Sequence, residues 1–527
     1  MSTTTADTIG IPADAGERID PRRLIAFLAM CFGMFMSLLD IQVVSASLTE
    51  IQAGLAASAD EISWVQTSYL IAEVVAIPLS GFLSRALGTR TMFAASAAGF
   101  TIASLMCGFT SSMNEMIIWR AIQGFIGGGM IPTVFASIYT IFPRSKQAIF
   151  LPIIGLVATL APTIGPTVGG YLTDALSWHW LFFINIGPGI AVTAVTFALI
   201  DFDKPDLSLF KHFDWWGLGF MAAFLGSLEY VLEEGERYDW FDDQTIATLT
   251  VVSALSAVAF FARAVMARSP IVDLKAYANR NFALGSLFSF VLGIGLYGLT
   301  YLYPVYLEEI RGYNALMIGE TLFVSGAAMF LSAPVVGKLV TKLDPRFVMM
   351  AGFFIFAAGS WQMTFVTKDW DFYELLWPQI FRGIGMMLAI VPITNLALGT
   401  LAPAQLKNAS GLFNLARNLG GAVGLAALNT VLNHRIDLHL ARLHDAVSWG
   451  RQPAQEALTN LTARFQDFGS DAQTMALRQL MLLTRQQGIV MAFADVFLIF
   501  AVVFAAFGAL SMVMRRPAAL PGGAAGH

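Results

Sequence analysis

The chain has 527 residues, of which 56% are hydrophobic and only 13% are charged, with a formal net charge of −5. Soluble proteins carry about 25% charged residues, so this composition excludes a soluble globular protein and indicates a chain that crosses a membrane many times. The two cysteines, Cys31 and Cys107, lie in apolar runs and predict no disulfide framework.

Fourteen apolar runs predict an all-α membrane protein with 14 transmembrane helices. They lie near residues 24–48, 62–83, 91–110, 115–141, 148–173, 181–200, 215–232, 245–267, 282–306, 316–340, 347–366, 375–400, 409–432 and 488–514. No GxxxxGK[ST] stretch is present, so nothing in the sequence indicates ATP hydrolysis.

The first run contains one full charge, Asp40. At a rise of about 1.5 Å per residue, Asp40 lies roughly 25 Å from Arg23 in a hydrocarbon core about 30 Å thick. A carboxylate at that depth costs several kcal/mol unless it faces a partner, water or a proton, so it is a candidate functional residue. The alternative is a hydrated side chain near the outer mouth of the span.

Two further charges lie inside early spans. Arg120 opens the fourth run at a depth similar to that of Asp40, and an unpaired buried charge is costly, so we expect the two to pair. Glu73 lies near the middle of the second run, where it would meet a cationic drug or a second proton. Alternatively, Arg120 is a structural anchor for helix ends, and Glu73 is a hydrogen-bonded packing residue. Glu229, in the seventh run, is expected to lie outside the central cavity.

An internal repeat relates the two halves of the chain. GFLSRALGTR at 81–90 matches GKLVTKLDPR at 337–346 in its glycine, leucines and final arginine, and Arg120 has a counterpart in Arg382. Repeats around a midplane site are common in secondary transporters. The predicted organisation is a tail (1–23), a six-helix bundle (24–200), a linker with two extra helices (201–281), a second six-helix bundle (282–514) and a tail (515–527).

The fifth run, with GLVATLAPTIGPTVGG, is rich in glycine and proline. Prolines bend a helix, and glycines four residues apart allow a neighbouring helix to approach closely. We therefore expect a bend and a close contact at Gly165, Pro166, Gly169 and Gly170; ordinary tight packing is the alternative.

Basic residues gather in the connections that share a side with the N-terminus, which predicts cytoplasmic N- and C-termini. The long polar insert at 433–487 would then lie outside. Its leucines recur at helical spacing beside arginines, so it predicts amphipathic helices that dock a partner or form a lid over the cavity. His434, His439 and His444 do not share a helix face, so no metal site is predicted.

Several motifs resemble one family. GPTVGG, RAIQGFIGGG and GFLSRALGTR resemble signatures of the major facilitator superfamily, and SWVQTSYLIAEVVAIP, WHWLFFINIGPG, EEGERYDWF and RNLGGAVG are similar to its fourteen-helix drug:proton antiporters of the EmrB type. The chain departs from the usual superfamily patterns in two places. One is the first-span motif, which reads LLDIQVVSASL, and the other is Arg85, where most of the superfamily has an acidic residue. Proteins of the EmrB type also carry a basic residue at the position of Arg85. The resemblance implies two six-helix bundles plus two extra helices, and export of lipophilic drugs in exchange for protons.

The same resemblance implies a bacterial inner-membrane protein that works with a periplasmic adaptor and an outer-membrane channel, with no enzymatic activity, cofactor, metal or nucleic acid. It implies that Asp40 carries the proton and that Arg120 tunes it, and the depth of Glu73 in the second run makes it the expected second carboxylate for proton coupling. Polar residues expected in the substrate cavity are Gln42, Gln66, Tyr69, Gln123, Arg382, Asn395, Asn414 and Arg417. Residues expected to act in conformational change are Gly81, Arg85, Gly88, Arg90, Gly165, Pro166, Gly169 and Gly170. The alternatives are a dedicated exporter of one metabolite, such as a siderophore or fatty acid, and a membrane sensor or scaffold that transports nothing.

Overall fold

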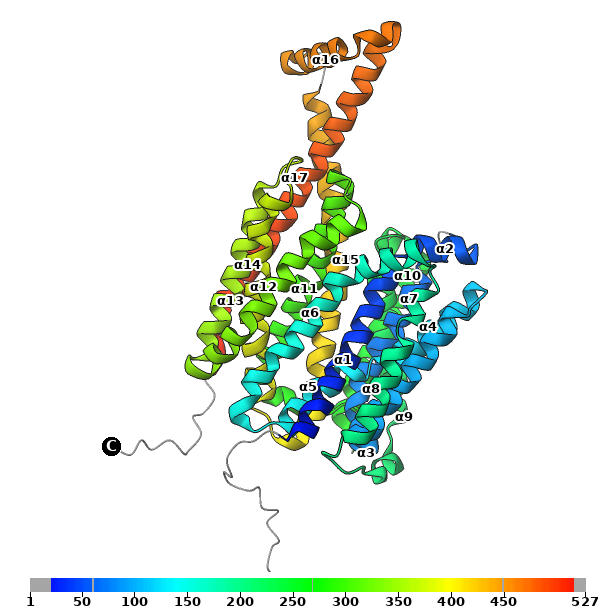
Figure 1. Cartoon of the computed structure of the whole chain (residues 1–527), viewed down its shortest axis with the longest axis vertical. Helices are drawn as coiled ribbons and strands as arrows, with labels where there is room; N and C mark the ends of the chain where they lie inside the picture. Colours follow the sequence, from blue (N-terminus) through cyan, green and yellow to red (C-terminus); the bar gives the residue numbers. More distant parts are fainter. Residues whose placement is uncertain (1–19, 59–60, 268, 448–449, 516–527) are drawn as a thin grey trace, which may run out of the picture.

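The structure is a computed structural model that describes residues 20–58, 61–267, 269–447 and 450–515 (Figure 1). The predicted tails, 1–23 and 515–527, lie almost wholly outside these residues. We call the end of the molecule where α1 begins and α17 ends the terminal face, and the opposite end the insert face. Among the described residues the regular structure is helical, as the composition predicted.

The first half of the chain forms one bundle in which α1 packs against α6 and α8, and α3 packs against α4, α5 and α8. Local sequence sets the helix ends: Asp20 caps α1 ahead of a proline, and Ser112 caps α4 by accepting from the Glu115 amide. The helices are α1 (Pro21–Ser45), α2 (Leu48–Leu55), α3 (Trp64–Gly108), α4 (Met113–Gly127), α5 (Met130–Ile141), α6 (Arg144–Ala175), α7 (Trp180–Phe183) and α8 (Ile186–Leu199).

Two helices lie beside this bundle, α9 (Trp215–Glu234) and α10 (Gln244–Met266). They pack on each other and reach the rest of the protein through α3 and α15. Asp214 caps α9 and forms an ion pair with Arg263 of α10 at 2.9 Å, which ties the two helices together at the terminal face. Only 17% of the most apolar part of α10 is buried, so this helix presents most of its surface outward.

The second half forms the other bundle, in which α11 packs on α14 and α15, and α13 packs on α14 and α17. Its helices are α11 (Arg280–Arg311), α12 (Ala315–Lys342), α13 (Pro345–Gln362), α14 (Phe372–Leu398), α15 (Leu406–Ala446), α16 (Gln452–Arg464) and α17 (Ala472–Leu510). The two bundles meet along α3 with α15 and along α6 with α12.

Within the described residues, eleven helices are long and apolar enough to cross a membrane, or twelve if the bent pair Ile149–Pro162 and Ile164–Ala175 is one span. The 45 residues of α3 contain two predicted spans, 62–83 and 91–110, separated at Gly88. There the backbone has φ +78°, a conformation that favours glycine. The predicted span 409–432 lies in α15, which is not among the eleven. The total of 14 spans therefore stays a prediction.

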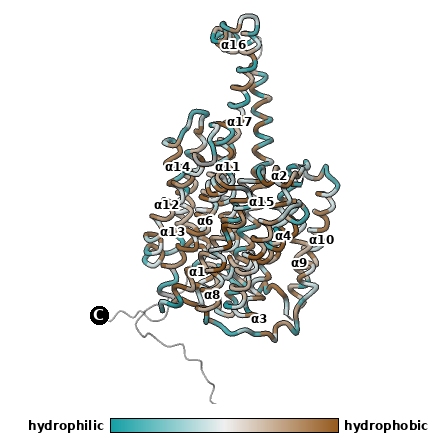
Figure 2. Tube along the Cα trace, turned by 45° about the vertical axis from the view of Figure 1, so that its right-hand side comes forward, coloured by the Kyte–Doolittle hydropathy of each residue, from teal (hydrophilic) through white to brown (hydrophobic). Residues whose placement is uncertain are grey.

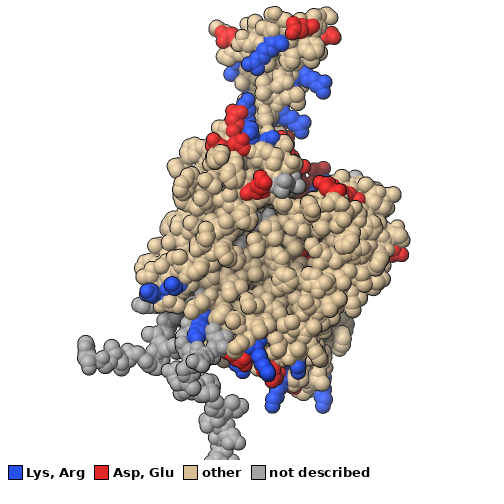
Figure 3. All heavy atoms as spheres, viewed as in Figure 1, with Lys and Arg blue, Asp and Glu red and all other residues tan. Residues whose placement is uncertain are grey.

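Hydropathy and charge are arranged as a membrane protein requires. The body of the molecule is mainly hydrophobic (Figure 2), and charged side chains gather at its two ends and on the insert (Figure 3). Beyond the insert face, α15 and α17 continue as a helical hairpin that carries α16. Leu458, Leu461 and Ala476 form a small separate core there, which confirms the prediction that the insert is helical.

Candidate functional site

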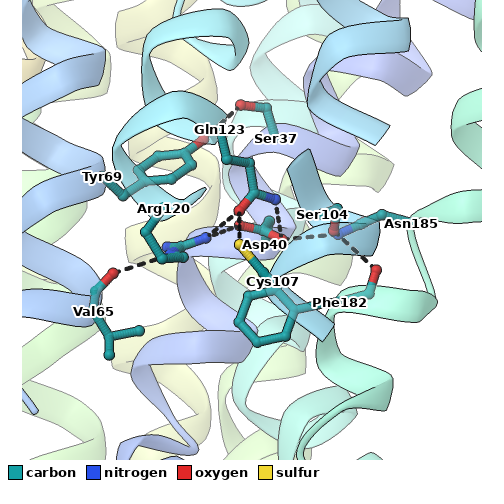
Figure 4. Close-up of polar contacts among 10 residues, drawn as sticks. All are labelled: Ser37, Asp40, Val65, Tyr69, Ser104, Cys107, Arg120, Gln123, Phe182 and Asn185. Atoms are coloured by element: carbon teal, nitrogen blue, oxygen red, sulfur yellow. Dashed lines mark hydrogen bonds and ion pairs between the residues drawn. The ribbon is translucent and has the colours of Figure 1, made fainter. Parts of the chain in front are cut away.

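Asp40 lies in α1 at the centre of a buried polar network (Figure 4). Its Oδ2 accepts a hydrogen bond from Arg120 Nη1 at 2.6 Å, and both side chains have 0% exposure. Its Oδ1 accepts from Gln123 Nε2 at 3.1 Å and from Asn185 Nδ2 at 2.8 Å. The expected pair between Asp40 and Arg120 is therefore present, and the carboxylate accepts hydrogen bonds from three side chains.

Arg120 is fixed on several sides. Its Nη1 also donates to Gln123 Oε1 at 2.8 Å, and its Nε donates to the Val65 carbonyl at 2.9 Å. Its Cζ lies 4.3 Å from the centre of the Tyr69 ring, which is a favourable cation–π geometry. Its Nη2 is buried and has no hydrogen-bond partner among the described residues. Arg120 thus depends on Asp40 for its counter-ion while one donor stays unsatisfied.

A second layer of hydrogen bonds positions the residues that touch Asp40. Asn185, at the junction of α7 and α8, also donates to Ser104 Oγ at 3.0 Å, and Ser104 donates to the Phe182 carbonyl at 2.9 Å. Sequence reasoning did not select Asn185 or Ser104. Asn185 lies in the apolar run WHWLFFINIGPG, so the signal that selected Asp40, a polar group in an apolar span, was also available for it.

Glu73 follows Tyr69 by one turn of α3 but stays outside this network. Its side chain is 2% exposed, and its Oε1 has no hydrogen-bond partner among the described residues. A Cβ on Gly128 would lie 3.1 Å from Glu73 Cγ, so the carboxyl stem packs directly on the α4–α5 junction. A buried and unsatisfied carboxyl group is costly, and it is therefore a candidate site for a proton or a cation.

The residues predicted to line a substrate cavity do not gather in one place. Tyr69 and Gln123 are 0% exposed and belong to the charge network. In the other bundle, Arg382 donates to Thr300 Oγ1 at 2.7 Å. Arg417 contacts Asn414 and lies 4.9 Å from the centre of the Phe135 ring in α5. Gln42, Gln66 and Asn395 are half-buried.

The glycines of α6 pack against the helix that carries Asp40. A Cβ on Gly165 would lie 2.3 Å from Gln42 Cβ, and one on Gly169 would lie 2.8 Å from the Val43 carbonyl oxygen. Pro166 and Gly170 lie within the same helix. The predicted close approach at this motif is therefore an approach of α6 to α1, within three residues of Asp40.

The predicted conformational residues of α3 lie at the terminal face, where the bundles join. A Cβ on Gly81 would lie 2.9 Å from Asn408 Cα in α15. Arg85 donates to the Gly81 carbonyl at 3.3 Å, and Arg90 donates to the Phe197 carbonyl at 2.6 Å. Gly88 lies at the break between the two predicted spans of α3.

Further bonds across the bundles complete this contact, which we call the terminal clamp (Ser84, Thr89, Asp203, Lys407). Lys407 of α15 donates to the Ser84 carbonyl at 2.9 Å and forms an ion pair with Asp203. Asp203 in turn accepts from the Thr89 amide at 3.0 Å. A further bond joins α5 to α14, in which Tyr139 donates to the Thr394 carbonyl at 3.0 Å. The two bundles are therefore held together in their terminal-face halves.

Comparison with known proteins identifies the family of this chain. A profile of the Major Facilitator Superfamily matches residues 30–425. The chain is 40% identical over 490 residues to the colistin resistance protein EmrB of Acinetobacter baumannii, covering 93% of this chain and 96% of that protein. It is 31% identical over 439 residues to the multidrug export protein EmrB of Escherichia coli K12, covering 83% of this chain and 86% of that protein.

Among solved structures, the human organic anion transporter MFSD10 has the same fold, with a TM-score of 0.56 and 11% identity over 92% of this chain and 100% of that one. The sequence comparisons show the family, and the structural likeness shows the fold. The chain is a multi-pass membrane transporter and belongs to the major facilitator superfamily.

Proposed function

We propose that this transporter exports lipophilic drugs in exchange for protons. The observation that carries the proposal is the buried Asp40–Arg120 pair, because a carboxylate inside a membrane domain is the simplest group that can take up and release a proton. The names of the two relatives, a colistin resistance protein and a multidrug export protein, support drugs as the cargo.

The geometry of the pair supports a coupling mechanism. When Asp40 binds a proton, Arg120 loses its counter-ion while remaining buried. Removing one partner of a buried pair costs about 3–5 kcal/mol, which changes the ratio of two conformations by roughly two to nearly four orders of magnitude. Because Asp40 and Asn185 join α1 to the α7–α8 junction, proton uptake weakens the contact between these elements and favours a rearranged bundle.

The distribution of basic residues supports an orientation with the terminal face in the cytoplasm. Arg346 donates to the Met514 carbonyl, and Arg515 donates its amide to Asn281, so these segments all meet at that face. In this orientation, the terminal clamp supports a state closed to the cytoplasm. The protein would lie in the inner membrane of a bacterium.

We further propose that the insert at 433–487 docks a periplasmic adaptor, which joins the transporter to an outer-membrane channel. Support comes from the helical hairpin formed by α15 and α17, which continues past the body of the molecule and carries α16. Its own small core at Leu458, Leu461 and Ala476 makes it a structured surface rather than a loop.

The test is efflux from inverted membrane vesicles with an imposed pH gradient, across a panel of lipophilic compounds. We expect at least one compound to move against its gradient and to stop moving when the pH gradient is collapsed. Export that does not depend on pH for any compound would contradict proton exchange, and absence of export for the whole panel would contradict drug transport.

A further inference from the structure

A second pair of buried carboxyl groups lies at the boundary between the first bundle and the extra helices. Glu73 in α3 is 2% exposed, and Glu229 in α9 is 6% exposed. Glu73 Oε1 and Glu229 Oε2 are both buried without a hydrogen-bond partner among the described residues. Neither side chain has a role in the Asp40 network, and α9 is not part of either six-helix bundle.

The two carboxyl groups lie at similar depth. Thr67 of α3 donates to Glu234 Oε1 of α9 at 3.0 Å, and a Cβ on Gly226 would lie 3.4 Å from Ile71. Since the helices rise about 1.5 Å per residue, these contacts place Glu73 and Glu229 within about one helical turn of each other.

The charges around this pair are not balanced. Arg120 is paired with Asp40, and Arg417 of α15 donates to Asn414. Glu233, one turn beyond Glu229, adds a third acidic group. Two buried carboxylates without a cation of their own cannot both stay ionised at low cost, so the pair holds a proton or a bound cation.

An apolar cavity lies about one helical turn from the pair on the terminal-face side, and neither carboxyl group lines it. Its volume is 530 Å³, which is within the usual range for small-molecule sites, about 300–1,000 Å³. Pro78, five residues after Glu73, and Leu225, four residues before Glu229, both line it. Phe261 of α10 also lines it and is 48% exposed, so the cavity reaches the lateral surface of the molecule that would face lipid.

We propose that Glu73 and Glu229 form a binding site for a lipophilic monocation that enters sideways from the membrane. Its apolar body occupies the cavity between α3, α9, α10 and α15, and its charge lies against the two carboxyl groups. Binding displaces the proton that the pair holds, and this proton passes to the solvent. The inference rests on the proposed export function and names a substrate class for it, and it gives the extra helix α9 a direct part in binding.

The first experiment measures binding of radiolabelled tetraphenylphosphonium to the purified full-length protein in detergent. We expect Glu229→Gln and Glu73→Gln each to weaken binding at least about tenfold, as expected for loss of one favourable charge interaction worth about 1.4 kcal/mol. The matched control is Glu320→Gln, an exposed glutamate of α12. Wild-type affinity in both site variants would overturn the proposal.

The second experiment records proton release on adding tetraphenylphosphonium to the unbuffered protein. Wild type should release a proton and Glu229→Gln should not; equal release from both would overturn the proposal. If Glu229→Gln does not fold, Ala416→Phe fills the cavity away from the carboxyl groups and should weaken binding as well. The vesicle assay on wild type decides the export function separately, because it succeeds or fails whatever these variants bind.

Discussion

Asp40→Asn tests the central charge pair because it removes the charge while keeping the size of the side chain. The carboxylate accepts hydrogen bonds from Arg120, Gln123 and Asn185 at 2.6, 3.1 and 2.8 Å. An asparagine has one NH2 group, which must face either Arg120 or the two amide donors. The variant therefore loses at least one hydrogen bond and leaves Arg120 without a counter-ion, for a loss of about 3–5 kcal/mol of stability.

The assays are the melting temperature of the purified protein, followed by tryptophan fluorescence, and gradient-driven efflux from vesicles. We expect Asp40→Asn to lower the melting temperature and to abolish efflux. Arg120→Gln should cost less stability, because the remaining carboxyl can bind a proton. The double variant should regain stability but not efflux. Wild-type efflux in Asp40→Asn would refute the coupling role, and a double variant as unstable as Asp40→Asn would refute the charge-pair argument.

Three further changes test other parts of the mechanism. Gly165→Leu and Gly169→Leu should separate α6 from α1, because an added Cβ would lie 2.3 Å from Gln42 Cβ and 2.8 Å from the Val43 oxygen. Both variants should reduce export severalfold in vesicles, unlike Gly187→Ala, whose added Cβ would meet no neighbour within 4 Å. Gly81→Leu should prevent closure at Asn408 and increase labelling of a cysteine introduced at the terminal face; unchanged labelling would contradict the closure role. Replacing 447–471 by a Gly/Ser linker should preserve vesicle transport but abolish co-purification of an adaptor, whereas loss of vesicle transport with binding intact would make the insert a gate.

Part of the site could be predicted because depth in a membrane helix follows from residue number. Asp40 and Arg120 were placed in the same half of their helices from the rise per residue alone, and the cost of an unpaired charge then required a partner. Gln123 lies three residues after Arg120, so it shares a helix face with it and joined the same network. Asn185 is 145 residues from Asp40, and only the packing of α8 on α1 brings them together.

The residues predicted to line the cavity show what depth alone does not determine. Depth does not give the rotation of a helix about its axis, which is set by packing against its neighbours. Arg382 therefore turns to Thr300 within its own bundle, while Arg417 reaches Phe135 of the other bundle. Polar residues at similar depth consequently have different partners, and Gln123 lies in the charge network.

The position of α3 explains how these separate sites would act together. Along one helix lie Tyr69, whose ring packs on Arg120, then Glu73 beside α9, then Gly81 against Asn408. The helix is continuous from Tyr69 to Gly81, with Pro78 as a point where it can bend, and it breaks at Gly88. A change in charge at Asp40 that frees Arg120 removes a contact on Tyr69, and any resulting tilt of α3 moves Glu73 and Gly81 with it. In the proposed mechanism, α3 therefore connects the proton site, the proposed cation site and the terminal clamp, because this one helix contacts all three.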